Sequence, residues 1–164
     1  MSNTEFVYTT YIKTTPEKVW AAITHPEFRR QYWVDGIVSD WKKDSKWQQI
    51  ASGNNPIVVL GGKILESVPP KRLVMTWADP ADTTDISKHS RVTFEIEPIE
   101  GMVRLNVIHG NLKTGSIMAG KISVGWPRVL CSMKSFLETG VALDTWAGQL
   151  EINACTPVAT GVSK

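Results

Sequence analysis

The sequence predicts an α+β fold in which a curved antiparallel sheet wraps around a long C-terminal helix, with two short helices after the first strand. Three observations predict it. Apolar residues alternate along consecutive segments, which is typical of strands buried on one face. Two helix starts, at Pro16 and Pro26, follow the first strand. An apolar stripe at helical spacing runs through residues 115–138 and supplies the cover that such a sheet needs.

The length and composition indicate one globular domain. The chain has 164 residues, of which 42% are hydrophobic and 21% charged, close to globular averages. Its net charge of +2 is too small to attract nucleic acid. The sequence has no run of about 18 apolar residues, so we expect no membrane-spanning helix. We expect a single domain over residues 1–140 and a C-terminal extension over 141–164, partly disordered because small residues dominate its end.

The first strand and two short helices open the chain. Aromatic and β-branched residues predict a strand over 6–12. Thr15 can cap a helix that starts at Pro16, and a second helix is expected over 26–32. The apolar face of the first helix consists of Val19, Trp20 and Ile23. Trp20 is therefore expected to fasten this helix to the sheet.

The remaining strands form a meander. They are expected at residues 37–41, 47–51, 57–68, 73–77, 91–96 and 103–107. Gly61 and Gly62 predict a bulge or bend in the longest of them. Trp41 and Trp47 flank the first turn, where we expect them to be partly exposed as an aromatic patch for a partner.

The long helix is expected over 115–138 and ends before Gly140. Pro127 lies inside it and predicts a kink or break just before that residue. The apolar stripe comprises Ile122, Trp126, Val129, Leu130, Met133 and Leu137.

Short motifs for metals, thiols and nucleotides are weak. The three histidines show no ligand spacing, and Cys131 and Cys155 are far apart, so we expect no metal, no cofactor and free thiols in the cytoplasm. Residues 115–121 match most of a phosphate-binding loop. However, Ile122 stands where a hydroxyl should reach magnesium, and no strand follows. The segment is better interpreted as the entry into the helix.

An ordered set of short motifs resembles one family. The motifs are Pro16-Glu17-Lys18-Val19-Trp20, His25-Pro26-Glu27, Pro69-Pro70-Lys71-Arg72-Leu73, Ile108-His109-Gly110, Gly125-Trp126-Pro127 and Leu137-Glu138-Thr139-Gly140. The chain resembles the C-terminal domain of the activator of the Hsp90 ATPase in its stand-alone bacterial form, within the START/Bet v 1-like (SRPBCC) superfamily. The resemblance covers roughly residues 5–140 and implies the helix-grip fold, with a hydrophobic cavity between sheet and helix. It implies no single ligand, because the superfamily includes lipid carriers, cyclases and hormone receptors.

His109 is the main polar candidate for that cavity. It continues the inward series Val103, Leu105 and Val107 by one step of two, so its imidazole should face the interior. Two interpretations stay open. The ring is tethered to a neighbouring carbonyl or hydroxyl, or it contacts a ligand or acts as an acid/base.

Aromatic residues complete the predicted ligand site. Its lining is expected to comprise His109, Trp126, Tyr32, Trp33, Trp77 and Met133. The favoured function is binding of a small apolar molecule, because no nucleophile–base pair or metal set is visible. Two alternatives stay open: a cavity enzyme of cyclase or hydrolase type with unknown catalytic residues, and a chaperone-associated interaction module. A homodimer is compatible with either.

Overall fold

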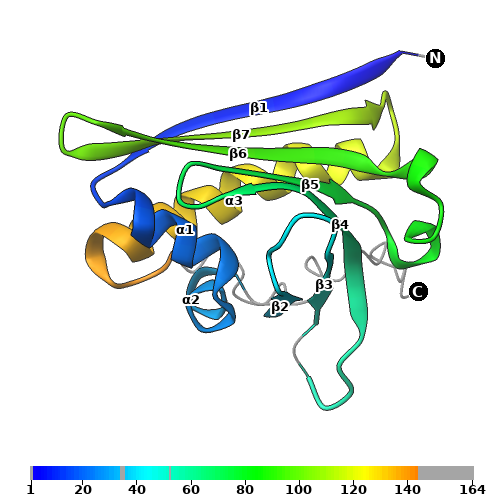
Figure 1. Ribbon diagram of the computed structural model, residues 1–164, viewed down its shortest axis with the longest axis horizontal. Helices are drawn as coiled ribbons and strands as arrows, with labels where there is room; N and C mark the ends of the chain where they lie inside the picture. The colour runs from blue at the N-terminus through cyan, green and yellow to red at the C-terminus, as the bar shows by residue number, and fades with distance from the viewer. Residues whose placement is uncertain (1, 34–35, 52, 144–164) are drawn as a thin grey trace, which may run out of the picture.

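The computed structural model describes residues 2–33, 36–51 and 53–143 (Figure 1). In this part of the chain, seven antiparallel strands form one sheet in the order β1-β7-β6-β5-β4-β3-β2. The strands are β1 (Asn3–Ile12), β2 (Gly36–Ser39), β3 (Lys46–Ile50), β4 (Val58–Val68), β5 (Arg72–Trp77), β6 (Ser90–Ile99) and β7 (Met102–Lys113). The helices are α1 (Pro16–Thr24), α2 (Pro26–Tyr32) and α3 (Ile117–Thr139). The predicted helix-grip fold is confirmed.

The sheet curves over α3, which runs along its inner face (Figure 1). The inward residues of β7, Val103, Leu105, Val107 and His109, are all fully buried, as the alternation predicted. Helices α1 and α2 lie near the C-terminal end of α3. There the rings of Phe28 and Tyr32 contact Phe136, with centroid separations of 6.5 and 6.3 Å. The two ends of the interior are therefore built differently: the short helices close one end only.

Helix α3 begins and ends at capping residues. The Ser116 side chain accepts a hydrogen bond from the Ala119 backbone N–H at 3.1 Å, so the helix starts two residues later than predicted. Gly140 ends it in the left-handed region, at a φ of 78°. The helix continues through Pro127 without the predicted break. Its predicted stripe is buried apart from Leu137, which is partly buried against the core.

The glycine pair in β4 has a different role from the predicted bulge. The register shifts of this strand fall between Ile64 and Glu66 and opposite Gln49 and Ile50, not at the pair itself. A Cβ on Gly62 would lie 2.1 Å from the carbonyl oxygen of Thr76. The glycine is therefore required for close backbone approach between β4 and β5.

The prediction that Trp47 is partly exposed is wrong. This residue is 1% exposed, and its Nε1–H donates to the carbonyl of Thr76 at 2.8 Å. Trp41 is partly buried against the core. Residues 47 and 49 lie on the same face of strand β3, and that face is buried. Trp47 therefore points inward. The two rings do not form the proposed surface patch.

The start of the C-terminal extension turns back onto α3. Ser135 donates to the carbonyl of Val141 at 2.7 Å, and Ser132 donates to that of Leu143 at 3.3 Å. The predicted disorder at the end of the extension falls on residues outside those that the structure describes, as does Cys155.

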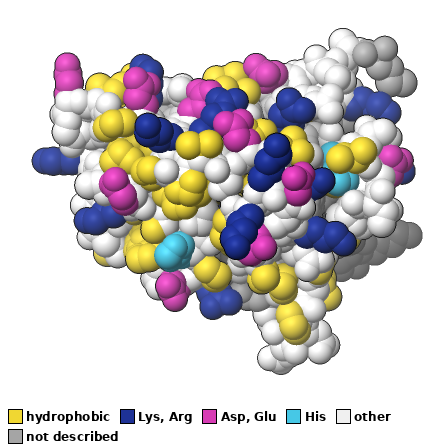
Figure 2. Space-filling model, viewed as in Figure 1, with side chains coloured by type: hydrophobic (Ala, Val, Ile, Leu, Met, Phe, Trp, Pro, Cys, Tyr) yellow, Lys and Arg dark blue, Asp and Glu magenta, His cyan; other side chains and the backbone are white. Residues whose placement is uncertain are grey.

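The surface carries both charge signs. Figure 2 shows Lys and Arg interleaved with Asp and Glu over the visible face. Ion pairs link several of them, including Arg72 with Glu66 and Glu95 at 3.2 and 2.6 Å. Within the described residues, no helix has both the length and the hydropathy needed to cross a membrane.

Candidate ligand pocket

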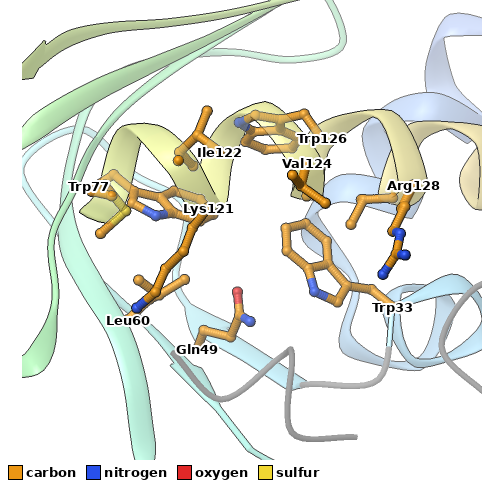
Figure 3. Close-up of a pocket in the computed structure, with 13 residues that line it drawn as sticks. Trp33, Gln49, Leu60, Trp77, Lys121, Ile122, Val124, Trp126 and Arg128 are labelled. Carbon is orange, nitrogen blue, oxygen red and sulfur yellow. The ribbon is translucent and has the colours of Figure 1, made fainter. Parts of the chain in front are cut away.

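A pocket of about 320 Å³ lies between the first half of α3 and strands β3, β4 and β5 (Figure 3). Its walls are mainly aromatic and aliphatic side chains: Trp33, Leu60, Trp77, Ile122, Trp126 and Val129. A volume of this size matches the smaller end of typical small-molecule sites. The helix-grip fold here therefore forms an apolar pocket, bordered by the exposed Val124, beside its packed core.

Two glycines of α3 help to create this space. Gly120 and Gly125 both line the pocket, and a Cβ on either would meet no atom within 4 Å. Glycine within a helix costs about 0.5–1 kcal/mol relative to alanine. Gly120 is exposed and Gly125 is half-buried, so these glycines lower helix stability and keep the rim of the pocket free of side-chain atoms.

Tryptophan rings form the floor of the pocket. Trp77 lies 5.7 Å from Trp126, 6.5 Å from Trp33 and 4.8 Å from Trp47, measured between ring centroids. Trp33 also meets Trp126 edge-on at 5.8 Å. Such mutual contacts hold large rings in fixed orientations. The floor is consequently preformed rather than assembled around a ligand.

His109 lies behind this floor in a complete hydrogen-bond chain. The indole Nε1–H of Trp126 donates to His109 Nδ1 at 3.0 Å. Because an indole nitrogen only donates, Nδ1 must be the acceptor, and Nε2 carries the proton. That Nε2–H donates to Ser90 Oγ at 2.7 Å, and Ser90 donates in turn to the carbonyl of Trp77 at 3.0 Å.

The chain also determines the chemistry of His109. Burial lowers the pKa of its imidazole to about 3, so the ring is neutral at physiological pH. Both nitrogens are engaged within the protein. Of the two interpretations left open by the sequence, the geometry matches the tethered histidine. Its position behind Trp126 orients that indole at the pocket wall.

Tyr32 and Met133 also lie outside the pocket lining. The Tyr32 hydroxyl donates to the carbonyl of Ala22 at 2.6 Å and ties α2 to α1, while burial raises the pKa of the phenol to about 12. Met133 is 2% exposed within the packed core. Of the six predicted residues, Trp33, Trp77 and Trp126 line the pocket, whereas Tyr32, His109 and Met133 support structure around it.

Three polar lining residues were missed by the sequence analysis: Gln49, Lys121 and Arg128. Gln49 is 1% exposed, and its Oε1 accepts from Arg29 Nη2 at 2.8 Å. Arg29 is itself buried and lies 3.8 Å over the Trp33 ring. Gln49 could have been predicted to face inward, because it alternates with Trp47 along one strand. Lys121 and Arg128 are two helical turns apart, and this spacing places them on the same side of α3.

The glycine-rich segment at the start of α3 does not form a phosphate-binding loop. Residues 117–121 are already helical, which leaves only Gly115 and Ser116 before the helix. No group of three or more His, Cys, Asp or Glu side chains suitable for a metal ion occurs in the described parts of the chain.

The architecture and pocket define a helix-grip protein, and sequence comparison places it more closely. The profile of the family described as "Activator of Hsp90 ATPase homolog 1-like protein" matches residues 13–138. The chain belongs to this family. No curated protein matches it.

Several solved structures share the fold. The Aha1 dimer from Colwellia psychrerythraea has a TM-score of 0.67 at 20% identity, over 84% of this chain and 98% of that one. Protein MLL2253 from Mesorhizobium loti has a TM-score of 0.67 at 23% identity, over 82% and 96%. CalU16 from Micromonospora echinospora has a TM-score of 0.64 at 20% identity, over 83% and 77%. At these identities the likeness concerns the fold.

Proposed function

We propose that this protein binds a small apolar molecule in the pocket beneath the first half of α3. The observation that carries the proposal is the preformed space of about 320 Å³ with aromatic and aliphatic walls. Protein interiors normally pack at high density, so an apolar pocket of this volume at the edge of the core is a distinct feature. Burial of an apolar molecule there removes its surface from water and favours binding.

The charged lining supports a neutral or anionic ligand. Lys121 and Arg128 are the charged residues among the pocket-lining side chains, and both are cationic. No carboxylate side chain occurs among the described lining residues to attract a cationic ligand. Binding is also better supported than catalysis, because His109, the proposed acid/base, has both nitrogens engaged and a pKa of about 3.

Filling the gap at Gly125 tests the proposal. A naphthalene-sulfonate dye that fluoresces in apolar sites is titrated into the wild type and into Gly125→Leu. Leucine here enters open space, so we expect a normal fold and at least a tenfold loss of dye affinity, as ligand and side chain compete for one volume. Ser123→Leu is the matched control, since it adds the same side chain to an exposed helix position outside the lining. Equal affinity in Gly125→Leu and wild type contradicts the proposal.

Assembly and location form a separate part of the proposal. A homodimer is supported by the Colwellia structure, which is described as a dimer, and by β1, which lies at one edge of the sheet. Light scattering after size-exclusion chromatography measures the mass directly.

A cytoplasmic location is consistent with the free thiol of Cys131. A chaperone contact rests on the family name alone.

A further inference from the structure

We propose that the ligand presents an sp² oxygen, as a carbonyl or carboxylate, to the indole Nε1–H of Trp77. This inference rests on the proposed function and specifies the ligand class. Trp77 lines the pocket and is 3% exposed, yet its Nε1–H has no hydrogen-bond partner. Buried indole N–H groups normally have one, because desolvation without a partner is unfavourable.

The neighbouring indoles show what is missing at Trp77. Trp47 donates to the carbonyl of Thr76, and Trp126 donates to His109 Nδ1. The carbonyl of Trp77 itself accepts from Ser90. Each of these nearby acceptors therefore already receives a donor from another side chain. Among the buried side-chain atoms of the residues that the structure describes, Trp77 Nε1 is the one indole nitrogen without a partner.

The lining side chains offer Trp77 no free acceptor. Gln49 alone among them carries an oxygen, and that Oε1 already accepts from Arg29 Nη2 at 2.8 Å. Figure 3 shows Trp77 and Lys121 at one end of the pocket and Trp33 and Arg128 at the other. In this view the nitrogen-bearing edge of Trp77 is turned toward Leu60. The Nε1 atom is itself buried, so an acceptor at that end pairs the orphan N–H by displacing a neighbouring lining side chain. The acceptor then lies on the side of the Lys121 ammonium, which favours a carboxylate as well as a neutral carbonyl.

Matched probes isolate the acceptor from the apolar body. The probes are 2-acetylnaphthalene, 2-isopropenylnaphthalene and 2-naphthoate, of which the first two differ by oxygen against methylene. Calorimetric titration measures the affinities. We expect the wild type to bind the ketone about fivefold more tightly than the alkene, the range of one net hydrogen bond. The Trp77 indole resonance, assigned by its loss in Trp77→Phe, should move downfield with the ketone or with naphthoate, and should stay in place with the alkene.

Variants then assign the effect to the N–H. In Trp77→Phe the ketone and the alkene should bind equally, because phenylalanine keeps a ring but has no donor. Trp33→Phe removes an indole from the other end of the pocket and should weaken both probes by the same factor. Naphthoate that binds more tightly than the ketone, with that advantage lost in Lys121→Met, assigns the oxygen to a carboxylate. The opposite order assigns it to a neutral carbonyl.

Three outcomes overturn the inference, and they differ in what else they affect. Equal wild-type affinities for ketone and alkene remove the role of Trp77 and leave the apolar pocket in place. The same follows if the preference for the ketone persists in Trp77→Phe. If none of the probes, including the fluorescent dye, binds the wild type, the proposed function itself fails and the inference fails with it.

Discussion

The two halves of α3 cover interiors of different kinds. Its second half carries Leu130 and Met133, both at most 2% exposed, and α3 as a whole contacts β1, β7 and the short helices. Its first half carries Gly120 and Gly125 over a pocket. Both halves have apolar inner faces, so hydrophobicity does not distinguish them. The difference lies at positions 120 and 125, where glycine provides no side chain. One continuous helix can thus complete a core and border a binding site.

The polar groups around the pocket also differ, in whether their hydrogen-bond donors have partners. The chain from Trp126 through His109 and Ser90 to the carbonyl of Trp77 pairs every donor in it. The Trp77 Nε1–H, on the same residue as the last acceptor, is unpaired. A satisfied network stabilises the folded state by itself, whereas an unsatisfied group gains from an added partner.

The largest expected effect on stability comes from a substitution in the second half of α3, which packs into the core. Leu130→Asp introduces a charge at a position that is 1% exposed, with no cationic partner provided, and should abolish stable folding, at a cost above about 4 kcal/mol. Val124→Asp makes an equivalent change in the first half of α3, at a position that is 54% exposed, and should leave a cooperative melt. Circular dichroism melting measures both. A Leu130→Asp protein with wild-type melting temperature would show that this half is not packed as described.

A smaller effect is expected from pH through His109. The folded-state pKa of about 3 lies below the value of 6.5 expected in the unfolded chain, so between these values only the unfolded chain takes up the proton. Acid therefore favours unfolding. His109 alone should lower the free energy of unfolding by about 2 kcal/mol between pH 7 and pH 5. Urea unfolding at the two pH values measures it.

The control for this prediction is His109→Gln, because glutamine can donate and accept but does not titrate in this range. The stability difference between wild type and variant should narrow by about the same 2 kcal/mol as pH falls to 5. A difference that stays constant with pH would mean that other groups cause the acid sensitivity.

The smallest expected effect on stability comes from substitutions in the first half of α3, which borders the pocket. Gly120→Ala and Gly125→Ala should each raise the free energy of unfolding by about 0.5–1 kcal/mol, since alanine favours the helix and its Cβ meets no atom within 4 Å. Urea unfolding again measures the change. Gly62→Ala is the contrasting control and should destabilise, because its Cβ would collide with the Thr76 carbonyl. Destabilisation by alanine at 120 or 125 would show that the space above the pocket is already occupied.

The order of elements was predictable because each depends on local periodicity. The inward series of β7 placed His109 correctly, and Ser116 and Gly140 lie at the ends of α3 where capping chemistry is expected. The exposure of Trp47 was mispredicted, since a turn-flanking position says nothing about which face the strand presents to a distant helix. The need for glycine at position 62 depends likewise on an approach to β5 that only tertiary structure supplies.

The pocket was only half predictable. Aromatic residues near the helix identified Trp33, Trp77 and Trp126 but equally Tyr32 and Met133, because helical spacing does not separate a filled interior from a hollow one. Hydrogen-bond partners also depend on residues far apart in sequence. Nothing local distinguishes the paired indole of Trp126 from the unpaired indole of Trp77.

The pairing of β1 with β7 has a kinetic consequence. Thr9 and Asn106, 97 positions apart in the chain, share a 2.8 Å hydrogen bond between the sheet's earliest and latest strands. During synthesis, β1 emerges first and has no strand partner until β7 follows. Contacts this distant in sequence require closure of a long loop, which costs entropy before the contacts can stabilise the fold. They therefore slow folding. We therefore expect the hairpin of β6 and β7 to form early and docking of β1 to come late.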